Sequence, residues 1–119
     1  MVRTAIPKQY WQLALDQISL CGWGSRVSIA VADEESDLQL MTRPAPFYGV
    51  SYDPKDDALA FGTENLKHRI IHPKHIDLTH EGVTICTLAI TGADDRRHSL
   101  SFNPPLALGR EVEVAREMA

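Results

Sequence analysis

The sequence predicts an α+β fold that is mainly β, in which an N-terminal helix precedes about six to seven short antiparallel strands of a small curled sheet or barrel. Apolar residues near the N-terminus recur at the spacing of a helix, and from Arg26 onward they alternate with polar residues as in half-buried strands. Turn-forming Gly, Pro and Asp residues separate the alternating segments, so the strands are expected to be short.

The helix is expected to begin near Pro7 and to end at about Cys21. Proline suits the first helical turn because its missing N–H would be unpaired there. One side of this segment carries an apolar stripe of Trp11, Ala14, Leu15, Ile18 and Cys21. Glycine tolerates the left-handed conformation with which many helices end, so Gly22 and Gly24 predict the stop.

The first strand is expected to begin at Arg26, because Val27, Ile29 and Val31 share one face. Further extended segments are predicted at residues 38–40, 47–52, 58–62, 66–72, 75–79, 83–91 and 97–102. The segment 83–91 is apolar at both parities, which predicts a central strand covered on both faces. The amphipathic helix is the expected cover for its second face, because a helix must bury its apolar side.

Length and composition predict a single globular domain. The chain has 119 residues, of which 44% are apolar and 24% charged, as in ordinary globular proteins. The domain is expected to span residues 1–103, and residues 104–119 are expected to form a tail that is a short helix or partly disordered.

The lengths of its apolar runs predict a cytoplasmic protein with no membrane partner. No apolar run approaches the roughly 20 residues that a membrane span requires, and residues 1–16 lack the apolar run of a secretory signal.

The two cysteines, Cys21 and Cys86, are far apart and form no Cys-x-x-Cys motif. We interpret them as buried thiols, with a disulfide between them as the alternative.

Charge is unevenly distributed along the chain. The net charge is −4, yet residues 66–75 contain Lys67, Arg69 and Lys74 without an acid, which leaves −7 for the remainder. These three cations, with Tyr48 and Tyr52, form the predicted binding surface. Because cations contact phosphates and aromatic rings stack on bases, a nucleic-acid-binding barrel that uses residues 66–75 is an alternative function. The negative total charge makes nucleic acid the less favoured partner.

Four histidines, His68, His72, His75 and His80, lie within thirteen residues. Four residues of a strand cover about 13 Å, which is too far for two imidazoles to bind one ion unless Pro73 folds the segment back. We therefore predict no metal and no other cofactor. His68, His72 and His75 remain the candidate ligands of the alternative, a small metal-binding or enzymatic protein.

No sequence motif indicates catalysis. A Gly-x-Ser-x-Gly elbow, a phosphate-binding loop and a dinucleotide fingerprint are all absent from the sequence. Asp53, Asp56 and Asp57 lack the ligand spacing of a calcium loop and are interpreted as turn residues. The protein is therefore expected not to be an enzyme.

Four segments form a pattern that extends over most of the chain. They are Ile6-Pro7 with Trp11, Gly22-Trp23, residues 46–57 (Pro-Phe-Tyr-Gly-Val-Ser-Tyr-Asp-Pro-Lys-Asp-Asp), and residues 68–73 (His-Arg-Ile-Ile-His-Pro) with Ile76. This pattern resembles a family of small bacterial proteins grouped as a domain of unknown function. The resemblance implies a bacterial source and a compact domain, and it implies no mechanism and no site residues. The order of one helix and short strands also resembles Sm-like and other SH3-like barrels, which is a likeness of fold alone.

These observations together predict a non-catalytic binding or protein-interaction module. Trp23, Phe47, Tyr48 and Tyr52 lie near predicted turns, and aromatic side chains are enriched where proteins meet. The expected partner is another protein or a second copy of this chain, which would bind through a strand edge or an exposed aromatic patch.

Overall fold

The computed structural model describes residues 2–32, 39–40 and 43–107 of the chain. The elements of these residues are β1 (Val2–Ala5), η1 (Lys8–Tyr10), α1 (Trp11–Gly22), β2 (Arg26–Ala32), β3 (Gln39–Leu40), β4 (Ala45–Asp53), β5 (Ala58–Thr63), β6 (Lys67–Ile71), β7 (His75–Glu81), β8 (Thr84–Thr91) and β9 (Arg97–Ala107). Within these ranges, no helix combines the length and the apolar character needed to cross a membrane.

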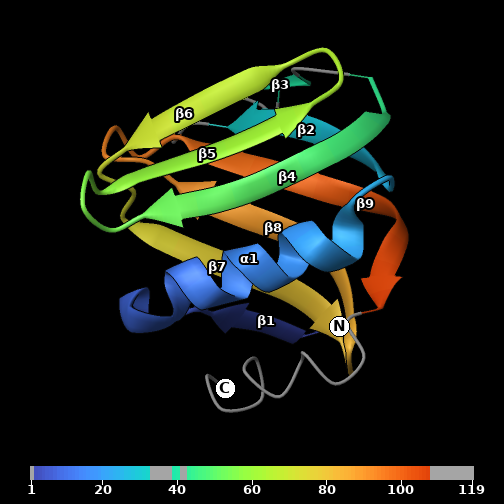
Figure 1. The fold of residues 1–119 in the computed structure, drawn as a ribbon, viewed down its shortest axis with the longest axis horizontal. Helices are drawn as coiled ribbons and strands as arrows, with labels where there is room; N and C mark the ends of the chain where they lie inside the picture. The colour runs from blue at the N-terminus through green and yellow to red at the C-terminus, as the bar shows by residue number, and fades with distance from the viewer. Residues whose placement is uncertain (1, 33–38, 41–42, 108–119) are drawn as a thin grey trace.

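The strands form one antiparallel sheet that folds over on itself into two layers (Figure 1). The strand order is β1-β7-β8-β9-β2-β4-β5-β6, and β3 pairs with β2. Strand β2 pairs with β9 along its whole length, but with β4 only at Arg26–Pro46 and Val27–Ala45. The sheet bends at this short junction, so β4, β5 and β6 lie across the other strands. The sheet does not close, because it ends at β1 on one side and at β6 on the other.

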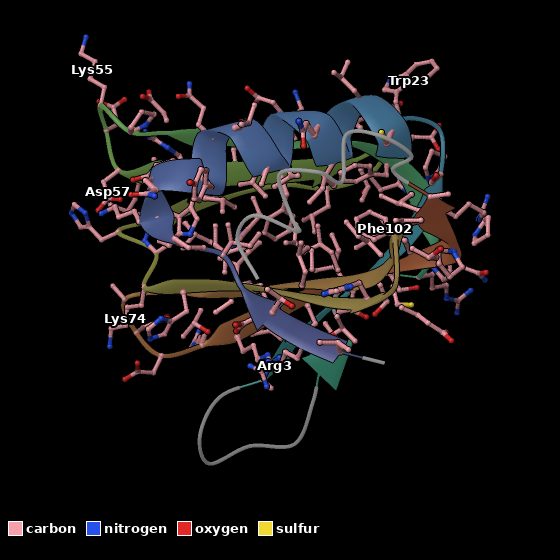
Figure 2. The ribbon with its side chains drawn as sticks, turned by 90° about the horizontal axis from the view of Figure 1, so that it is seen from below. Arg3, Trp23, Lys55, Asp57, Lys74 and Phe102 are labelled. Atoms are coloured by element: carbon pink, nitrogen blue, oxygen red, sulfur yellow. The ribbon has the colours of Figure 1, made fainter. Side chains whose placement is uncertain are left out.

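Helix α1 lies beside β4 and extends the layer of β4, β5 and β6 (Figures 1 and 2). Its buried residues are Trp11, Ala14, Leu15, Ile18 and Gly22, which confirms the predicted apolar stripe. Ser19 joins the helix to the strand, because its hydroxyl donates to the Val50 carbonyl and accepts the Val50 N–H at 2.8 Å. The helix therefore satisfies backbone groups that β4 would otherwise leave unpaired.

The helix ends at Gly22, as predicted, but the two glycines after Cys21 have different roles. Gly24 has the left-handed conformation, with φ of +86°. Gly22 is buried, and a Cβ atom there would lie 3.0 Å from side-chain atoms of both Phe47 and Leu106. Close packing therefore explains why position 22 is a glycine, whereas backbone conformation explains the glycine at position 24.

Side chains from both layers fill the space between them (Figure 2). Phe47 and Phe102 meet edge to face with ring centroids 5.2 Å apart, and Trp11 meets Tyr52 in the same way at 5.1 Å. The indole N–H of Trp11 donates to the Ile6 carbonyl at 2.7 Å. Aromatic pairs in this geometry add to the stability that burial alone provides.

The predicted mainly antiparallel β fold with an N-terminal helix is confirmed, and the structure adds two features. A strand that was not predicted, β1, precedes the helix and pairs with β7. Strand β9 continues beyond residue 103 to Ala107, and Leu106 is buried in the core. Residues 108–119, which make up most of the predicted tail, lie outside the described residues.

Strand β8 is central, as predicted, since it lies between β7 and β9. The apolar residues at its two parities have a different explanation from the predicted one. The register shifts between Ile85 and Thr87, so Ile85 joins Leu88 and Ile90 in the same core. A bulge exchanges the faces of a strand, which brings Ile85 to the same side as Leu88 and Ile90. Ala89 is buried at the opposite parity, and helix α1, which was expected to cover that face, packs along β4.

Candidate functional site

The outer face of β4, β5 and β6 carries a shallow groove of about 460 Å³. We call it the outer groove and define it by Tyr48, Gly49, Ala60, Gly62, Lys67 and Arg69, which are among its lining residues. The strand register explains the composition of the groove. Gly49, Gly62 and Lys67 form one row across the three strands, and Ser51, Ala60 and Arg69 form the next row. The middle of both rows has almost no side chain, so the backbone is accessible there.

A β-bulge presents Tyr48 to the outer groove. Phe47 pairs with Thr63 and Gly49 pairs with Gly62, so Tyr48 is the extra residue of β4. Gly49 has φ of +151°, a conformation that other residues rarely adopt. The Tyr48 side chain is 55% exposed, whereas neighbouring Phe47 is fully buried. Bulges often redirect a side chain near functional sites, and this bulge directs an aromatic ring to the surface.

The positive charge of the outer groove is not strongly neutralised by neighbouring acids. Lys67 has no ion-pair partner among the described residues. Arg69 and Asp56 lie 3.7 Å apart, and both side chains are more than half exposed. Exposed ion pairs of this kind are weak, so both cations are available to an anionic ligand.

The structure brings together three of the five predicted binding residues and separates the other two. Tyr48, Lys67 and Arg69 all line the outer groove. Tyr52 instead points into the core, with only 5% exposure, because it lies at the inward parity of β4. Lys74 lies beyond the end of β6, and its ammonium group pairs with Asp95 at 2.6 Å.

The three histidines proposed as metal ligands lie in three different environments. His68 faces the interior beside Phe61, His72 is exposed and contacts Asp57, and His75 is exposed at the start of β7. Within residues 2–32, 39–40 and 43–107, no three His, Cys, Asp or Glu side chains are placed to share a metal ion. Cys21 and Cys86 are partly buried thiols that do not form a disulfide with each other.

His98 is a site residue that the sequence interpretation missed. It is 94% buried, and its ring centroid lies 5.0 Å from that of His68. Its Nδ1 atom is buried and has no hydrogen-bond partner among the described residues. Burial, and then the neighbouring His68, lower the pKa of His98. The alternation along β9 could have identified His98 as an inward residue, because it shares its parity with Leu100 and Phe102, which face the core.

A second depression, which we call the edge cleft, separates β6 from the turn between β8 and β9. Its volume is about 380 Å³, and its lining residues include His68, Ile71, Gly92, Asp94, Arg96 and His98. Asp94 and Arg96 pair with each other at 3.7 Å, and both are exposed. The edge cleft therefore runs beside the last strand of the sheet and is polar at its rim.

A polar cluster lies at one end of the molecule, where Figure 2 shows Asp57. The Asp57 carboxylate accepts hydrogen bonds from the Tyr52 hydroxyl at 2.6 Å and from His72 Nδ1 at 3.0 Å, and the Lys8 ammonium lies 3.5 Å away. These contacts, led by the Tyr52 hydrogen bond, lower the pKa of Asp57 to about 2. Burial, together with Asp57, raises the pKa of Tyr52 to about 12. Both carboxylate oxygens therefore bind side chains of the same protein and stabilise the turn, as expected for a turn residue.

Comparison with known proteins gives a family but no activity. A family described as "Family of unknown function (DUF5335)" matches residues 2–111. An uncharacterized protein of Aquifex aeolicus (strain VF5) is 33% identical over 109 residues, which cover 91% of this chain and 98% of that protein. No solved structure matches the chain significantly. The chain therefore belongs to the DUF5335 family of unknown function, in agreement with the resemblance noted in its sequence.

Proposed function

We propose that the protein is a non-catalytic, cytoplasmic binding module that holds an extended segment of a protein partner in the outer groove. The observation that carries the proposal is the position of Tyr48, which a bulge presents opposite Lys67 and Arg69 across a glycine and alanine floor. A floor without bulky side chains lets a ligand backbone approach the sheet closely. The aromatic ring and the two cations then contact side chains of the ligand.

The charges of the groove favour an acidic partner. Lys67 and Arg69 are exposed, and among the acids of residues 2–32, 39–40 and 43–107 only Asp56 pairs with either of them, at Arg69. Opposite charges across an interface raise the association rate and select among partners. Tyr48 adds an exposed ring, and aromatic residues contribute strongly to binding energy at interfaces.

The non-catalytic part of the proposal is supported by the polar clusters. The Asp57 carboxylate is occupied by Tyr52, His72 and Lys8 of its own chain. His98 lines the edge cleft, but its Nδ1 atom is buried, so a substrate in the cleft does not reach that atom. A general acid or base must lie within hydrogen-bond reach of the substrate.

Fluorescence anisotropy with a labelled octapeptide of alternating glutamate and valine tests the proposal. We expect binding that Tyr48→Ala and Lys67→Glu each weaken at least about tenfold. Lys55→Glu is the matched control, because it makes the same charge change on an exposed turn and should leave the affinity unchanged. Equal losses in Lys67→Glu and Lys55→Glu, or no binding at low salt, would reject the outer groove as the site.

Single-stranded nucleic acid is a second candidate ligand, favoured by the exposed Tyr48 ring across the outer groove from Lys67, which forms no ion pair with a described acid. Bases stack on aromatic rings while lysine contacts phosphate. The test is an oligouridine of twelve nucleotides. Binding that weakens steeply with salt and is lost in Lys67→Glu would support this candidate, and the absence of binding at low salt would remove it.

A further inference from the structure

Strand β6 ends the sheet, and half of its backbone groups face away from β5. Two hydrogen bonds define which half. Thr63 N–H donates to the Leu66 carbonyl, and His72 N–H donates to the Asp57 carbonyl, so the even-numbered residues of this segment bond to β5. The N–H and C=O groups of Lys67, Arg69 and Ile71 therefore point to the open edge. Within the described chain, no strand pairs with this edge.

The side chains of the same three residues lie on the outer face. Lys67 and Arg69 line the outer groove, and Ile71 is 45% exposed. An added strand would pair its backbone with Lys67, Arg69 and Ile71, and the residues opposite them would place their side chains on this outer face. The two cations of β6 therefore favour acidic side chains opposite them in an added strand, and Ile71 favours an apolar one.

A second copy of this chain is a poor occupant of the edge. Antiparallel pairing of two β6 strands about a twofold axis at Arg69 would place the two Arg69 side chains opposite each other. Like charges directly opposite are destabilising in a sheet, and charged edge strands are a known protection against self-pairing. An acidic strand would instead be stabilised at this edge, because its carboxylates would pair with Arg69 in place of the weak exposed ion pair with Asp56.

Space beside β6 is available for such a strand. The edge cleft, of about 380 Å³, lies between β6 and the β8–β9 turn. His68 and His98 are among the residues that line it. The alternate side chains of an added strand would point toward this cleft, which small or weakly polar residues such as threonine suit.

We propose that the protein binds its partner by β-strand addition at the open edge of β6, with an antiparallel strand of the pattern apolar-x-acid-x-acid. This proposal rests on the function proposed above in one respect, because it keeps an extended acidic segment of a protein as the partner. It moves the backbone of that segment from the floor of the outer groove to the neighbouring edge of β6. Strand addition obtains affinity from main-chain hydrogen bonds and specificity from alternate side chains. Here the two acids face Arg69 and Lys67, and the apolar residue faces Ile71.

N-methylated peptides test the pairing directly. The parent probe is the labelled hexapeptide Val-Thr-Glu-Thr-Glu-Thr, and its affinity is measured by fluorescence anisotropy. Methylation of the first glutamate nitrogen removes an N–H that would bond to β6, so we expect a loss of at least about tenfold. Methylation of the threonine between the two glutamates alters an N–H that faces solvent, and the affinity should stay within about twofold. This second peptide is the matched control.

Charge reversal provides an independent readout. We expect Arg69→Glu to lose binding of the parent peptide and to bind Val-Thr-Lys-Thr-Glu-Thr, in which only the residue facing position 69 is reversed, whereas Lys55→Glu should behave as wild type in both assays. Equal binding of both methylated peptides would overturn strand addition and leave the outer groove as the site. Failure of the parent peptide and of the glutamate–valine octapeptide would overturn both proposals. Light scattering could instead show that wild type is a dimer and that Arg69→Glu is a monomer. This result would assign the edge to a second copy of the chain and overturn the proposal of an acidic partner.

Discussion

Asp57 contacts three elements of the fold through a single carboxylate. It accepts a hydrogen bond from Tyr52 of β4, pairs with His72 after β6, and lies near Lys8 of η1. The sequence interpretation assigned this residue to a turn, and that assignment is correct for the backbone. Its side chain does more, because it links the turn to the end of β4, to the residue after β6 and to the start of η1.

The pKa of Asp57 predicts how stability depends on acidity. The folded pKa is about 2, below the ordinary value of 3.8, so the charged carboxylate stabilises the fold above about pH 4 and this contribution is lost as the pH falls toward 2. We expect Asp57→Asn to lower the free energy of unfolding at neutral pH and to match wild type at about pH 2. Urea unfolding followed by circular dichroism across this range measures the difference.

Asp56→Asn is the control for this prediction. Its carboxylate contacts only the exposed Arg69 among described partners, so little change is expected at any pH. A difference between Asp57→Asn and wild type that persists undiminished at pH 2 would show that the carboxylate charge does not carry the effect.

At the scale of elements, the Ser19 hydroxyl adds hydrogen bonds to the apolar packing of α1 against β4. Ser19 is both donor and acceptor to the backbone of Val50, so it takes the place of a neighbouring strand at this edge. This contact positions α1 next to the bulge that presents Tyr48, because Ser19 also lines the outer groove.

Ser19→Ala is therefore expected to destabilise the protein by about 1–3 kcal/mol, because it leaves two backbone groups of Val50 without partners. Ser51→Ala is the control, since Ser51 is exposed on the outer face of the same strand. Urea unfolding of the two variants measures the difference. Equal stability of both variants would mean that water satisfies Val50 and that the hydroxyl is dispensable.

At the scale of the whole molecule, His68 and His98 form a contact between the two layers on the open side of the sheet. His68 belongs to β6 and His98 to β9, and Phe61 of β5 packs against both rings. The lowered pKa of His98 means that its neutral form is favoured in the fold. Its contribution to stability is complete above its ordinary pKa of 6.5 and is lost as the pH falls below that value.

We expect the melting temperature of wild type to fall between pH 8 and pH 5, and His98→Phe to reduce this fall. The ionisable groups that act on His98 are His68, Asp94 and Arg96, and the substitution leaves all three in place. Thermal unfolding followed by circular dichroism measures the change, with His75→Gln as an exposed control that should retain the wild-type response. An unchanged fall in His98→Phe would assign the acid sensitivity to other groups.

Local patterns in the sequence predicted much of this architecture. The stripe from Trp11 to Ile18 and the alternation at Val27 and Ile29 depend on burial of one face, which leaves a periodic signal. Strand β1 was not predicted, because four residues are too few to show a period and their extended form depends on pairing with β7.

The candidate site was only partly predictable from sequence. The charge of residues 66–75 identified Lys67 and Arg69, but their position opposite Tyr48 depends on strand register and on the bulge before Gly49. Lys74 was included as a cation of the same basic segment and Tyr52 as an aromatic ring able to stack, but the fold pairs Lys74 with Asp95 and directs Tyr52 inward. Long-range pairing decides such positions, and composition does not reveal it.

The two tryptophans occupy contrasting environments, which gives the protein two intrinsic optical probes. Trp11 is enclosed, with its indole N–H bonded to Ile6, whereas Trp23 is 74% exposed and projects away from the molecule in Figure 2. Iodide, an aqueous quencher, therefore quenches the fluorescence of Trp23, whereas it quenches the fluorescence of Trp11 only after the chain unfolds. Loss of the protected emission reports unfolding without any label.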